Sequence, residues 1–304
     1  MRTDLDHLPP AKRRELERVV QILFEEFGKA TDKTNGFGKH ARIFKIVLYG
    51  SYARGDWVDD PIGGYQSDYD ILIVVSHDKL TDFVDYWSAA EDRLMRELTI
   101  AKSITAPVNF IVHTLKDVNR QLDHGRPFFV DILQQGVALY EAEGFGLHPP
   151  RALPPDQARA EAEGYFERWF STAARSLRTF QLQRAEGDDD HWRRKAAFEL
   201  HQTTEQLYHC VLLVLTLYSP KSHKLNFLRS QAEQAAPELA AAWPREGKFE
   251  RRCFELLRLA YVNARYSPEY RITKEELEWL GERVTELQRL VQAACQRRLA
   301  PPDP

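Results

Sequence analysis

Two apolar segments most constrain what this chain can fold into. Residues 43–49 are mostly apolar, with several β-branched side chains, and end at Gly50-Ser51, and residues 71–75 are five aliphatics that follow Asp68-Tyr69-Asp70. Short runs of this composition are typical of buried strands. Because alternate residues of a strand share a face, we expect Asp68 and Asp70 to point the same way and Tyr69 to point to the opposite face.

The polar residues at the ends of these segments predict a binding site. Two carboxylates side by side at the start of a buried strand repel each other, so a hard divalent cation is expected between them. Backbone N–H groups at the Gly50-Ser51 turn can bind phosphate oxygens. Taken singly, Asp-x-Asp is common at loop edges and Gly-Ser is an ordinary turn. In combination they indicate a site for a metal-bound phosphate compound.

The arrangement Gly50-Ser51-x-Ala53-Arg54-Gly55, followed by Ser67-Asp68-x-Asp70, resembles the signature of minimal nucleotidyltransferases of the polymerase-β type. Residues 136–141 are also similar to the end of such domains. The resemblance implies that Asp68 and Asp70 are catalytic and bind Mg²⁺ or Mn²⁺. It also implies that Gly50 and Ser51 hold the phosphates of a nucleoside triphosphate, with ATP as the expected substrate. Arg54 either neutralises phosphate charge or is a helix-surface residue.

One residue departs from that signature. The family usually supplies a third carboxylate from a later strand, and here Asn109 stands in its place. An amide binds a metal weakly and cannot accept a proton at neutral pH. His113, four residues further and on the same face of a regular strand, is either a substitute or a solvent-facing residue at the strand end. The loop aspartates Asp56, Asp59 and Asp60 are further candidates for the missing ligand.

Periodicity and turn residues predict an α+β chain in which a small mixed sheet with flanking helices precedes an all-α bundle. In the loop 55–66, which is rich in structure-breaking residues and expected to lack regular structure, Trp57 and Tyr65 either stack on a base or attach the loop to the surface. The expected elements of the first half are helices over 9–27, 51–54, 81–98, 115–122 and 127–134 and strands over 41–49, 68–75, 107–113 and 136–141, with a loop over 28–40.

A segment rich in proline and glycine, residues 144–155, is the clearest domain boundary. We expect a nucleotidyltransferase domain over 1–145, a linker over 146–155 and a helical domain over 156–304. The spacing predicts helices over 156–185 with Asp156 as cap, 191–218, 225–234, 250–264 and 274–299. In the last of these, apolar residues alternate at spacings of three and four, which indicates core packing, a dimer seam or both.

The helical half resembles the HEPN domain (higher eukaryotes and prokaryotes nucleotide-binding). The residues that carry this resemblance are 197–206, Ser222-His223-Lys224-Leu225 and 260–266. Active HEPN ribonucleases carry an arginine followed, after four to six residues, by a histidine. Here Arg265 is followed by Tyr270 at the histidine position, so no ribonuclease activity is expected. The pair Arg194 and His201 has similar spacing on an earlier helix, and we interpret it as coincidence.

Composition restricts the setting of the protein. No apolar stretch is long enough to cross a membrane, and the first residues lack the apolar core of a signal peptide. The three cysteines are widely spaced and lie in apolar helical patterns, so we expect buried thiols in a reducing, cytoplasmic compartment. The net charge of −3 is too small to indicate a particular partner.

Three functions compete. The first is a magnesium-dependent nucleotidyltransferase that moves AMP from ATP to a protein or RNA hydroxyl, in a toxin–antitoxin or defence setting, as a homodimer through the helical domain. The second is a nucleotide- or RNA-binding regulator whose catalysis is weakened at Asn109 and Tyr270. The third is an aminoglycoside-type nucleotidyltransferase, against which the HEPN-like half argues.

Overall fold

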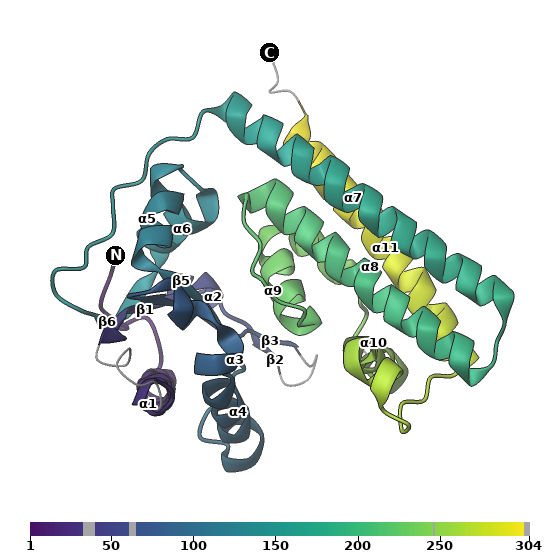
Figure 1. Cartoon of the computed structure of the whole chain (residues 1–304), viewed down its shortest axis with the longest axis horizontal. Coiled ribbons are helices and arrows are strands. Elements are labelled where there is room, and N and C mark those ends of the chain that lie inside the picture. Colours follow the sequence, from purple (N-terminus) through teal and green to yellow (C-terminus); the bar gives the residue numbers. More distant parts are fainter. Residues whose placement is uncertain (33–39, 61–64, 246, 301–304) are drawn as a thin grey trace. The chain divides into compact units, whose positions relative to one another are not determined.

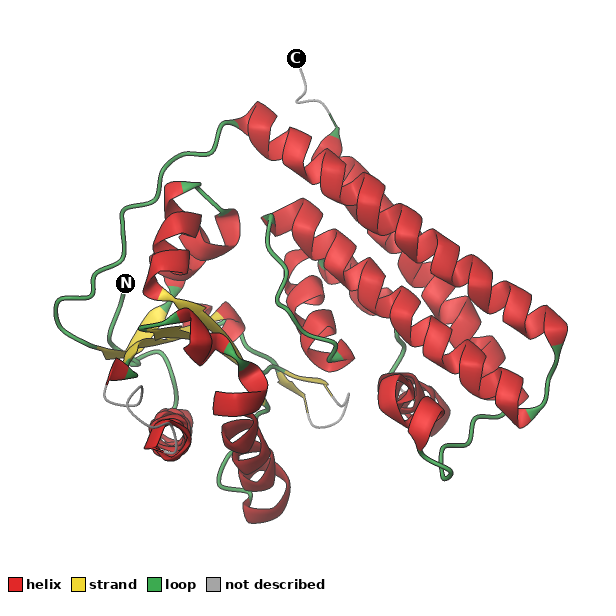
Figure 2. Cartoon of the chain, in the orientation of Figure 1, coloured by secondary structure: helices red, strands yellow, loops and turns green. Residues whose placement is uncertain are grey.

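The chain consists of two compact units, Met1–Leu153 and Pro154–Pro304. The computed structural model describes residues 1–32, 40–60, 65–245 and 247–300. The boundary between the units lies inside the segment 146–155 that the sequence suggests as a linker. Strands occur in the first unit, whereas the described part of the second is helical (Figure 2), so the expected mixed α+β class is confirmed.

The first unit is built on a four-stranded sheet with the order β5-β4-β1-β6 (Figure 1). The strands β4 and β5 are parallel, whereas β1 pairs antiparallel with both β4 and β6. The expected small mixed sheet is therefore confirmed. The strands are β1 (Ile43–Tyr49), β4 (Tyr69–Val75), β5 (Val108–Thr114) and β6 (Val137–Glu141).

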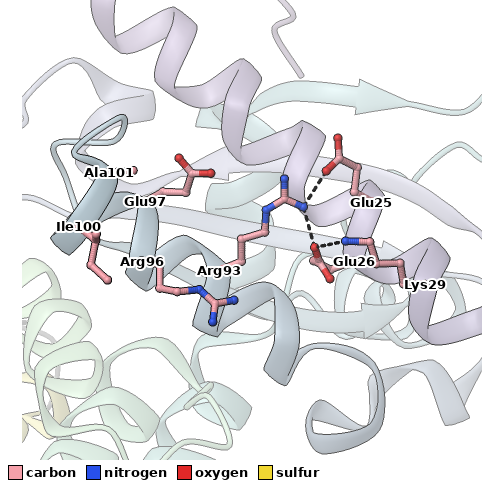
Figure 3. Close-up of a pocket in the computed structure, with 8 residues that line it drawn as sticks. All are labelled: Glu25, Glu26, Lys29, Arg93, Arg96, Glu97, Ile100 and Ala101. Carbon is pink, nitrogen blue, oxygen red and sulfur yellow. Dashed lines mark hydrogen bonds and ion pairs between the residues drawn. The ribbon is translucent and has the colours of Figure 1, made fainter.

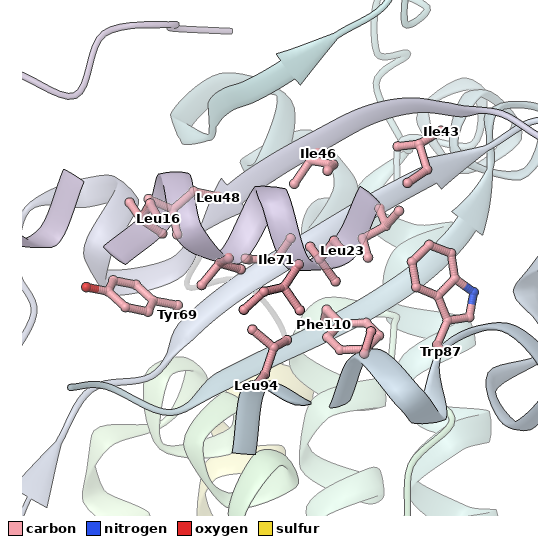
Figure 4. Close-up of a cluster of buried hydrophobic side chains, with 14 of the residues drawn as sticks. Leu16, Leu23, Ile43, Ile46, Leu48, Tyr69, Ile71, Trp87, Leu94 and Phe110 are labelled. Carbon is pink, nitrogen blue, oxygen red and sulfur yellow. The ribbon is translucent and has the colours of Figure 1, made fainter. Parts of the chain in front are cut away.

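Helices cover both faces of this sheet. On one face α1 (Pro10–Asp32) and α4 (Ser88–Arg96) enclose the main core, to which the odd-numbered residues of β4 contribute (Figure 4). On the other face lie α5 (Leu115–Asp123) and α6 (Pro127–Gln135) (Figure 1). Because side chains alternate along β4, Tyr69 enters the core and Asp70 points to the α5–α6 face. Labelled core residues in Figure 4 include Leu16, Leu23, Ile71, Trp87 and Phe110.

The single helix expected over 81–98 is wrong. The chain instead forms a 3₁₀ turn (Asp78–Thr81), a short α3 (Phe83–Tyr86), α4 and a π-helical turn (Glu97–Ala101). Asp82 accepts a hydrogen bond from the backbone N–H of Asp85 (3.0 Å) and so begins α3. Trp87 breaks the helix because its indole is buried and donates to the carbonyl of Leu80 (2.7 Å).

Two further expectations need correction. The segment 55–66 contains two short paired strands, β2 (Asp59–Asp60) and β3 (Tyr65–Gln66). The prediction that this segment lacks regular structure was therefore wrong. Helix α1 continues to Asp32, beyond the expected end at Phe27. Trp57 stacks on Tyr52, with ring centroids 5.4 Å apart, and thereby attaches the loop to the core. The side chain of Tyr65 lies outside the described residues.

In the second unit, α8 is the central element and packs against the other four long helices. The five helices of this unit are α7 (Pro155–Glu186), α8 (Asp190–Thr216), α9 (Leu225–Ala235), α10 (Lys248–Tyr266) and α11 (Lys274–Leu299), and a 3₁₀ segment covers Pro237–Ala242 in its described part. The regularly spaced apolar residues of α11 are buried within this unit, so core packing accounts for their pattern. They are Leu277, Leu280, Val284, Leu287, Val291 and Ala294.

The N-terminal ends of α7 and α8 differ in whether a side chain caps them. Asp189 caps α8 by accepting from the backbone N–H of Trp192 (2.9 Å). The prediction that Asp156 caps α7 was wrong, because that helix begins at Pro155 without a side-chain cap. All three cysteines are buried free thiols, as expected: Cys210, Cys253 and Cys295. Of the helices in the described ranges, none combines the length and apolar character needed to cross a bilayer.

Candidate functional site

The turn after β1 has the geometry that its glycine predicts. Helix α2 (Gly50–Arg54) begins directly where β1 ends. Gly50 has φ of 72°, a left-handed conformation that residues with a Cβ adopt at a cost. The helix ends after one turn at Gly55, whose φ is 88° and whose N–H donates to the carbonyl of Ser51 (2.9 Å). A glycine with positive φ therefore stands at each end of α2, Gly50 at its start and Gly55 just after it.

Two residues that the sequence interpretation missed bind the end of α2. His7 Nε2 donates to the carbonyl of Tyr52 (2.8 Å), and the Arg2 guanidinium donates to the carbonyl of Ala53 (2.5 Å). The last carbonyls of a helix have no partner within it, so these bonds satisfy groups that would otherwise need water. Residues 1–8 carry no periodic pattern that would have indicated this role.

The acidic pair lies beside this turn. Asp68 directly precedes β4, and Asp70 is its second residue and is fully buried. In the pairing register, Asp70 lies opposite Tyr49 of β1 and opposite Asn109 of β5. The Nδ2 of Asn109 donates to the Oδ2 of Asp68 (2.8 Å). The parallel pairing of β4 and β5 therefore brings together both carboxylates and the amide at the third-carboxylate position.

His113 does not join this group. In the register it lies opposite Val74, four residues beyond Asn109, which is about 13 Å along the strand. Its Nδ1 donates to Asp117 of α5 (2.6 Å). This hydrogen bond, together with the positive charges of His113 and Arg120, lowers the pKa of Asp117 to about 2. The histidine thus belongs to an ion-pair group between β5 and α5.

Arg54 is exposed and has a local partner. Its Nε lies 3.1 Å from the Oδ2 of Asp56, just after the end of α2. Partial burial raises the pKa of Asp131 in α6, and the nearby Arg54 charge offsets part of that rise. The guanidinium therefore lies at the surface, next to Asp56 and within electrostatic reach of Asp131 in α6.

The loop aspartates divide into three cases. Asp56 pairs with Arg54, and Asp59 accepts a long hydrogen bond from Gln66 (3.4 Å). The side chain of Asp60 lies outside the described residues. Burial raises the pKa of Tyr52, and the charges of Asp59 and Asp68 raise it further, so both carboxylates lie within electrostatic reach of the residue that follows Ser51.

The donor atoms decide which ion would suit this site. Within the described ranges, no group of three or more His, Cys, Asp or Glu side chains is arranged to hold a metal ion. The site instead offers two carboxylates and one amide, all with hard oxygen donors. Magnesium is usually bound in proteins through one or two carboxylates, with waters and substrate phosphates completing its shell. Asp68 and Asp70 fit that mode of binding, and they do not fit a cage made by protein alone.

A cavity of about 570 Å³ lies elsewhere in the first unit, between α1 and the α4–π segment. Its charged side chains largely neutralise one another: Arg93 lies 2.6 Å from both Glu25 and Glu26, and Lys29 lies 2.7 Å from Glu26 (Figure 3). None of the predicted site residues lines this cavity, so it does not bear on the chemistry proposed below. Its lining residues are Glu25, Glu26, Lys29, Arg93, Arg96, Glu97, Ile100 and Ala101.

In the second unit, Arg265 and Tyr270 do not form a pair. The Arg265 guanidinium is exposed and lies 4.7 Å from the ring centroid of Phe198 and 4.8 Å from that of Tyr261. The Tyr270 hydroxyl is directed inward and donates to the carbonyl of Leu256 (3.0 Å), and burial raises the pKa of this phenol. A buried phenol in this position cannot exchange protons with a ligand at Arg265.

The second spacing match, Arg194 and His201, has a structural explanation. The guanidinium of Arg194 donates to four backbone carbonyls at and beyond the end of α10, including Ser267 (2.6 Å) and Ala264 (3.0 Å). The buried ring of His201 lies 3.0 Å from the carbonyl of Leu257, also in α10. Both side chains therefore connect α8 to α10.

Two of the segments that carry the HEPN resemblance, 197–206 and 222–225, meet at Glu205. Its carboxylate lies 2.9 Å from His223 Nδ1, 3.7 Å from His201 Nε2 and 3.9 Å from His209 Nε2. Burial alone would raise the pKa of Glu205, but the nearby His201 ring and the hydrogen bond from His223 outweigh it and lower the pKa. The Glu205 carboxylate thus attaches the loop after α8 to that helix through His223. These two residues of the HEPN-like segments therefore have a structural role.

Comparison with known families defines the class of the second unit. The family model described as HEPN domain matches residues 166–294. The HEPN resemblance predicted for the helical half is therefore confirmed, and this part of the chain is a HEPN-type helical domain. The match does not extend into the first unit, where the nucleotidyltransferase assignment stays a prediction. A search of curated proteins finds no match to the chain.

Proposed function

We propose that the first unit is a magnesium-dependent nucleotidyltransferase that transfers AMP from ATP to a hydroxyl group of a protein or an RNA. The observation that carries this proposal is the convergence of Asp68, Asp70 and Asn109 beside the turn that follows β1. The resemblance of the Gly50-Ser51 and Asp68-x-Asp70 segments to polymerase-β-type enzymes adds to it.

Each residue has a role in this proposal. Asp68 and Asp70 would hold the cation, and the backbone of Gly50 and Ser51 would bind the β- and γ-phosphates. Bound magnesium would neutralise charge on the phosphates as pyrophosphate leaves. The acceptor oxygen attacks the α-phosphorus, and its proton has to reach a base. Because Asn109 cannot accept that proton, we expect slow turnover relative to nucleotide binding.

For the HEPN-type unit we propose binding of the RNA acceptor or of nucleotide, or formation of a homodimer, without ribonuclease activity. Tyr270 supports this proposal because its hydroxyl is buried and bonded to Leu256, away from Arg265. The buried free thiols support a reducing cytoplasmic compartment. A toxin–antitoxin or defence setting remains part of the proposal.

A second candidate is a regulator that binds nucleotide without turnover. The amide of Asn109 favours it, because its hydrogen bond to Asp68 fills the position where a third carboxylate would act. The aminoglycoside-type alternative is weaker, since the second unit matches the HEPN family.

Labelled ATP separates these candidates. The protein is incubated with α-³²P-ATP, Mg²⁺ and candidate protein or RNA acceptors, beside Asp70→Asn and the control Asp92→Asn, which changes an exposed carboxylate of α4. Transfer of label that Asp70→Asn abolishes and Asp92→Asn retains supports the enzyme. ATP-dependent thermal stabilisation without pyrophosphate release supports the regulator. If ATP neither stabilises nor labels anything, both proposals for this site fail.

A further inference from the structure

Behind the acidic pair, on the α1 side of the sheet, lies a buried charged network. Lys12 and Glu15 of α1 are each more than nine-tenths buried, although both are charged residues. Burying a charge is costly unless it is paired and hydrogen-bonded. The partners that satisfy these two side chains therefore indicate what the network holds in place.

Glu15 binds two segments that lead into the site. Its Oε2 accepts from the hydroxyl of Tyr69 (3.0 Å), the residue between Asp68 and Asp70. The same oxygen accepts from the backbone N–H of Thr105 (3.0 Å), and Oε1 accepts from the Thr105 hydroxyl (2.9 Å). Thr105 stands just before β5, the strand that carries Asn109.

Lys12 completes the network and adds the third segment. Its Nζ donates to the Thr105 hydroxyl (2.6 Å) and lies 3.8 Å from Glu15. It also lies 5.7 Å from the ring centroid of Tyr52 and 5.8 Å from that of Tyr69. These two rings contact each other at 4.3 Å, and Tyr52 directly follows Ser51. Lys12 and Glu15 thus contact Tyr52 after the turn, Tyr69 between the two aspartates and Thr105 before β5.

We propose that Lys12 and Glu15 are positioning residues for the candidate site and set the spacing of Asp68 and Asp70 from Asn109 and from the Gly50-Ser51 turn. The pair acts through Tyr69, Thr105 and Tyr52. The expected effect on cation and nucleotide binding rests on the proposed function. The positioning itself can be measured separately.

The physical argument depends on strand alignment. The hydrogen bond from Asn109 to Asp68 joins neighbouring parallel strands at the end where Tyr69 N–H also donates to the carbonyl of Pro107 (2.8 Å). Glu15 connects the same two strand ends from the opposite face of the sheet. Loss of the Tyr69–Glu15 bond frees these ends to shift relative to each other. A residue that orients a metal ligand from behind changes metal affinity or activity by about 10-fold to 100-fold when removed.

The test uses Tyr69→Phe, which removes only the hydroxyl and keeps the buried ring, and Glu15→Gln. Glu17→Gln, an exposed carboxylate on the same helix, is the matched control. Two quantities are measured on the full chain: Mn²⁺ affinity in the presence of ATP, by electron paramagnetic resonance, and the NMR shift of the Asn109 side-chain amide, assigned with Asn109→Ser. Thermal stability is recorded for each variant.

We expect Tyr69→Phe to shift the Asn109 amide resonance and to weaken Mn²⁺ binding about 10-fold, with Glu17→Gln unchanged. If Tyr69→Phe lowers thermal stability but leaves both the amide resonance and the Mn²⁺ affinity unchanged, the network is only structural and the inference is overturned. If the wild-type protein binds no Mn²⁺, the proposed function fails, and the amide resonance alone then decides: a shift in Tyr69→Phe supports positioning, and no shift overturns it.

Discussion

Replacing Arg194 with alanine should release the C-terminal end of α10. In the folded chain the guanidinium donates to carbonyls of Asn263 (3.4 Å), Ala264 (3.0 Å), Ser267 (2.6 Å) and Tyr270 (3.3 Å). The Asn263 carbonyl already accepts the last helical bond, from Ser267 N–H (3.0 Å), whereas the other three lie in or beyond the last turn, where helical partners are missing. The side chain is only 16% exposed, so water replaces its bonds incompletely.

The size of the effect follows from the two short bonds. A hydrogen bond to a charged group contributes about 1.5 kcal/mol or more, so the bonds to Ala264 and Ser267 together predict a loss of about 3 kcal/mol. The two longer bonds add little. Arg194→Lys keeps the charge, but an ammonium cannot reach carbonyls on both sides as the planar guanidinium does, so it should recover only part of the loss.

Amide hydrogen exchange measured by mass spectrometry locates this effect, which matters because a chain of two units need not unfold in one step. A loss of about 3 kcal/mol predicts that peptides covering 259–272 exchange about 100-fold faster in Arg194→Ala. Arg178→Ala, which removes an exposed arginine that donates to the side chain of Gln181, is the control and should leave them unchanged. Acceleration below about 5-fold, or full protection in Arg194→Lys, would refute this account of the helix end.

Other predictions concern the turn, the β5–α5 ion pair and the altered HEPN motif. Gly50→Ala should cost about 1–2 kcal/mol in urea unfolding because φ is 72°, whereas Gly164→Ala in α7, where a Cβ meets nothing within 4 Å, should stabilise; equal effects would contradict this. Asp117 has a pKa lowered from 3.8 to about 2, so its contribution of about 2 kcal/mol is present above pH 4 and is lost as pH falls towards 2. The difference in unfolding free energy between wild type and Asp117→Asn should shrink over that range, and a constant difference would exclude the His113 pair as its source. Tyr270→His should destabilise the helical unit without producing RNA cleavage on a gel, because the position is buried; cleavage would show that Arg265 and residue 270 can act together.

Much of this molecule follows from its local sequence. The alternation of side chains along a strand was enough to predict that Tyr69 and its acidic neighbours lie on opposite faces of the sheet. Apolar spacing predicted the long helices of the second unit, and the Pro- and Gly-rich segment predicted where the chain divides. Gly50 marked a turn that requires a left-handed residue. These features depend on residues only a few positions apart, so local sequence patterns are enough to predict them.

The contacts that define the candidate site were decided by tertiary structure. The family resemblance placed Asn109 at the position of a third carboxylate, but its pairing opposite Asp70 follows from the parallel register of two strands separated by a helical segment. The same holds for His7 on α2, for Glu15 behind Tyr69 and for the inward direction of Tyr270. Each joins segments distant in the chain. A buried polar group without a hydrogen-bond partner costs free energy, and here the partner that removes this cost comes from elsewhere in the chain. The sequence identified Asp68, Asp70 and Gly50-Ser51 as candidates for binding metal and phosphate, whereas packing decided that Asn109 lies beside the two carboxylates and that His113 does not.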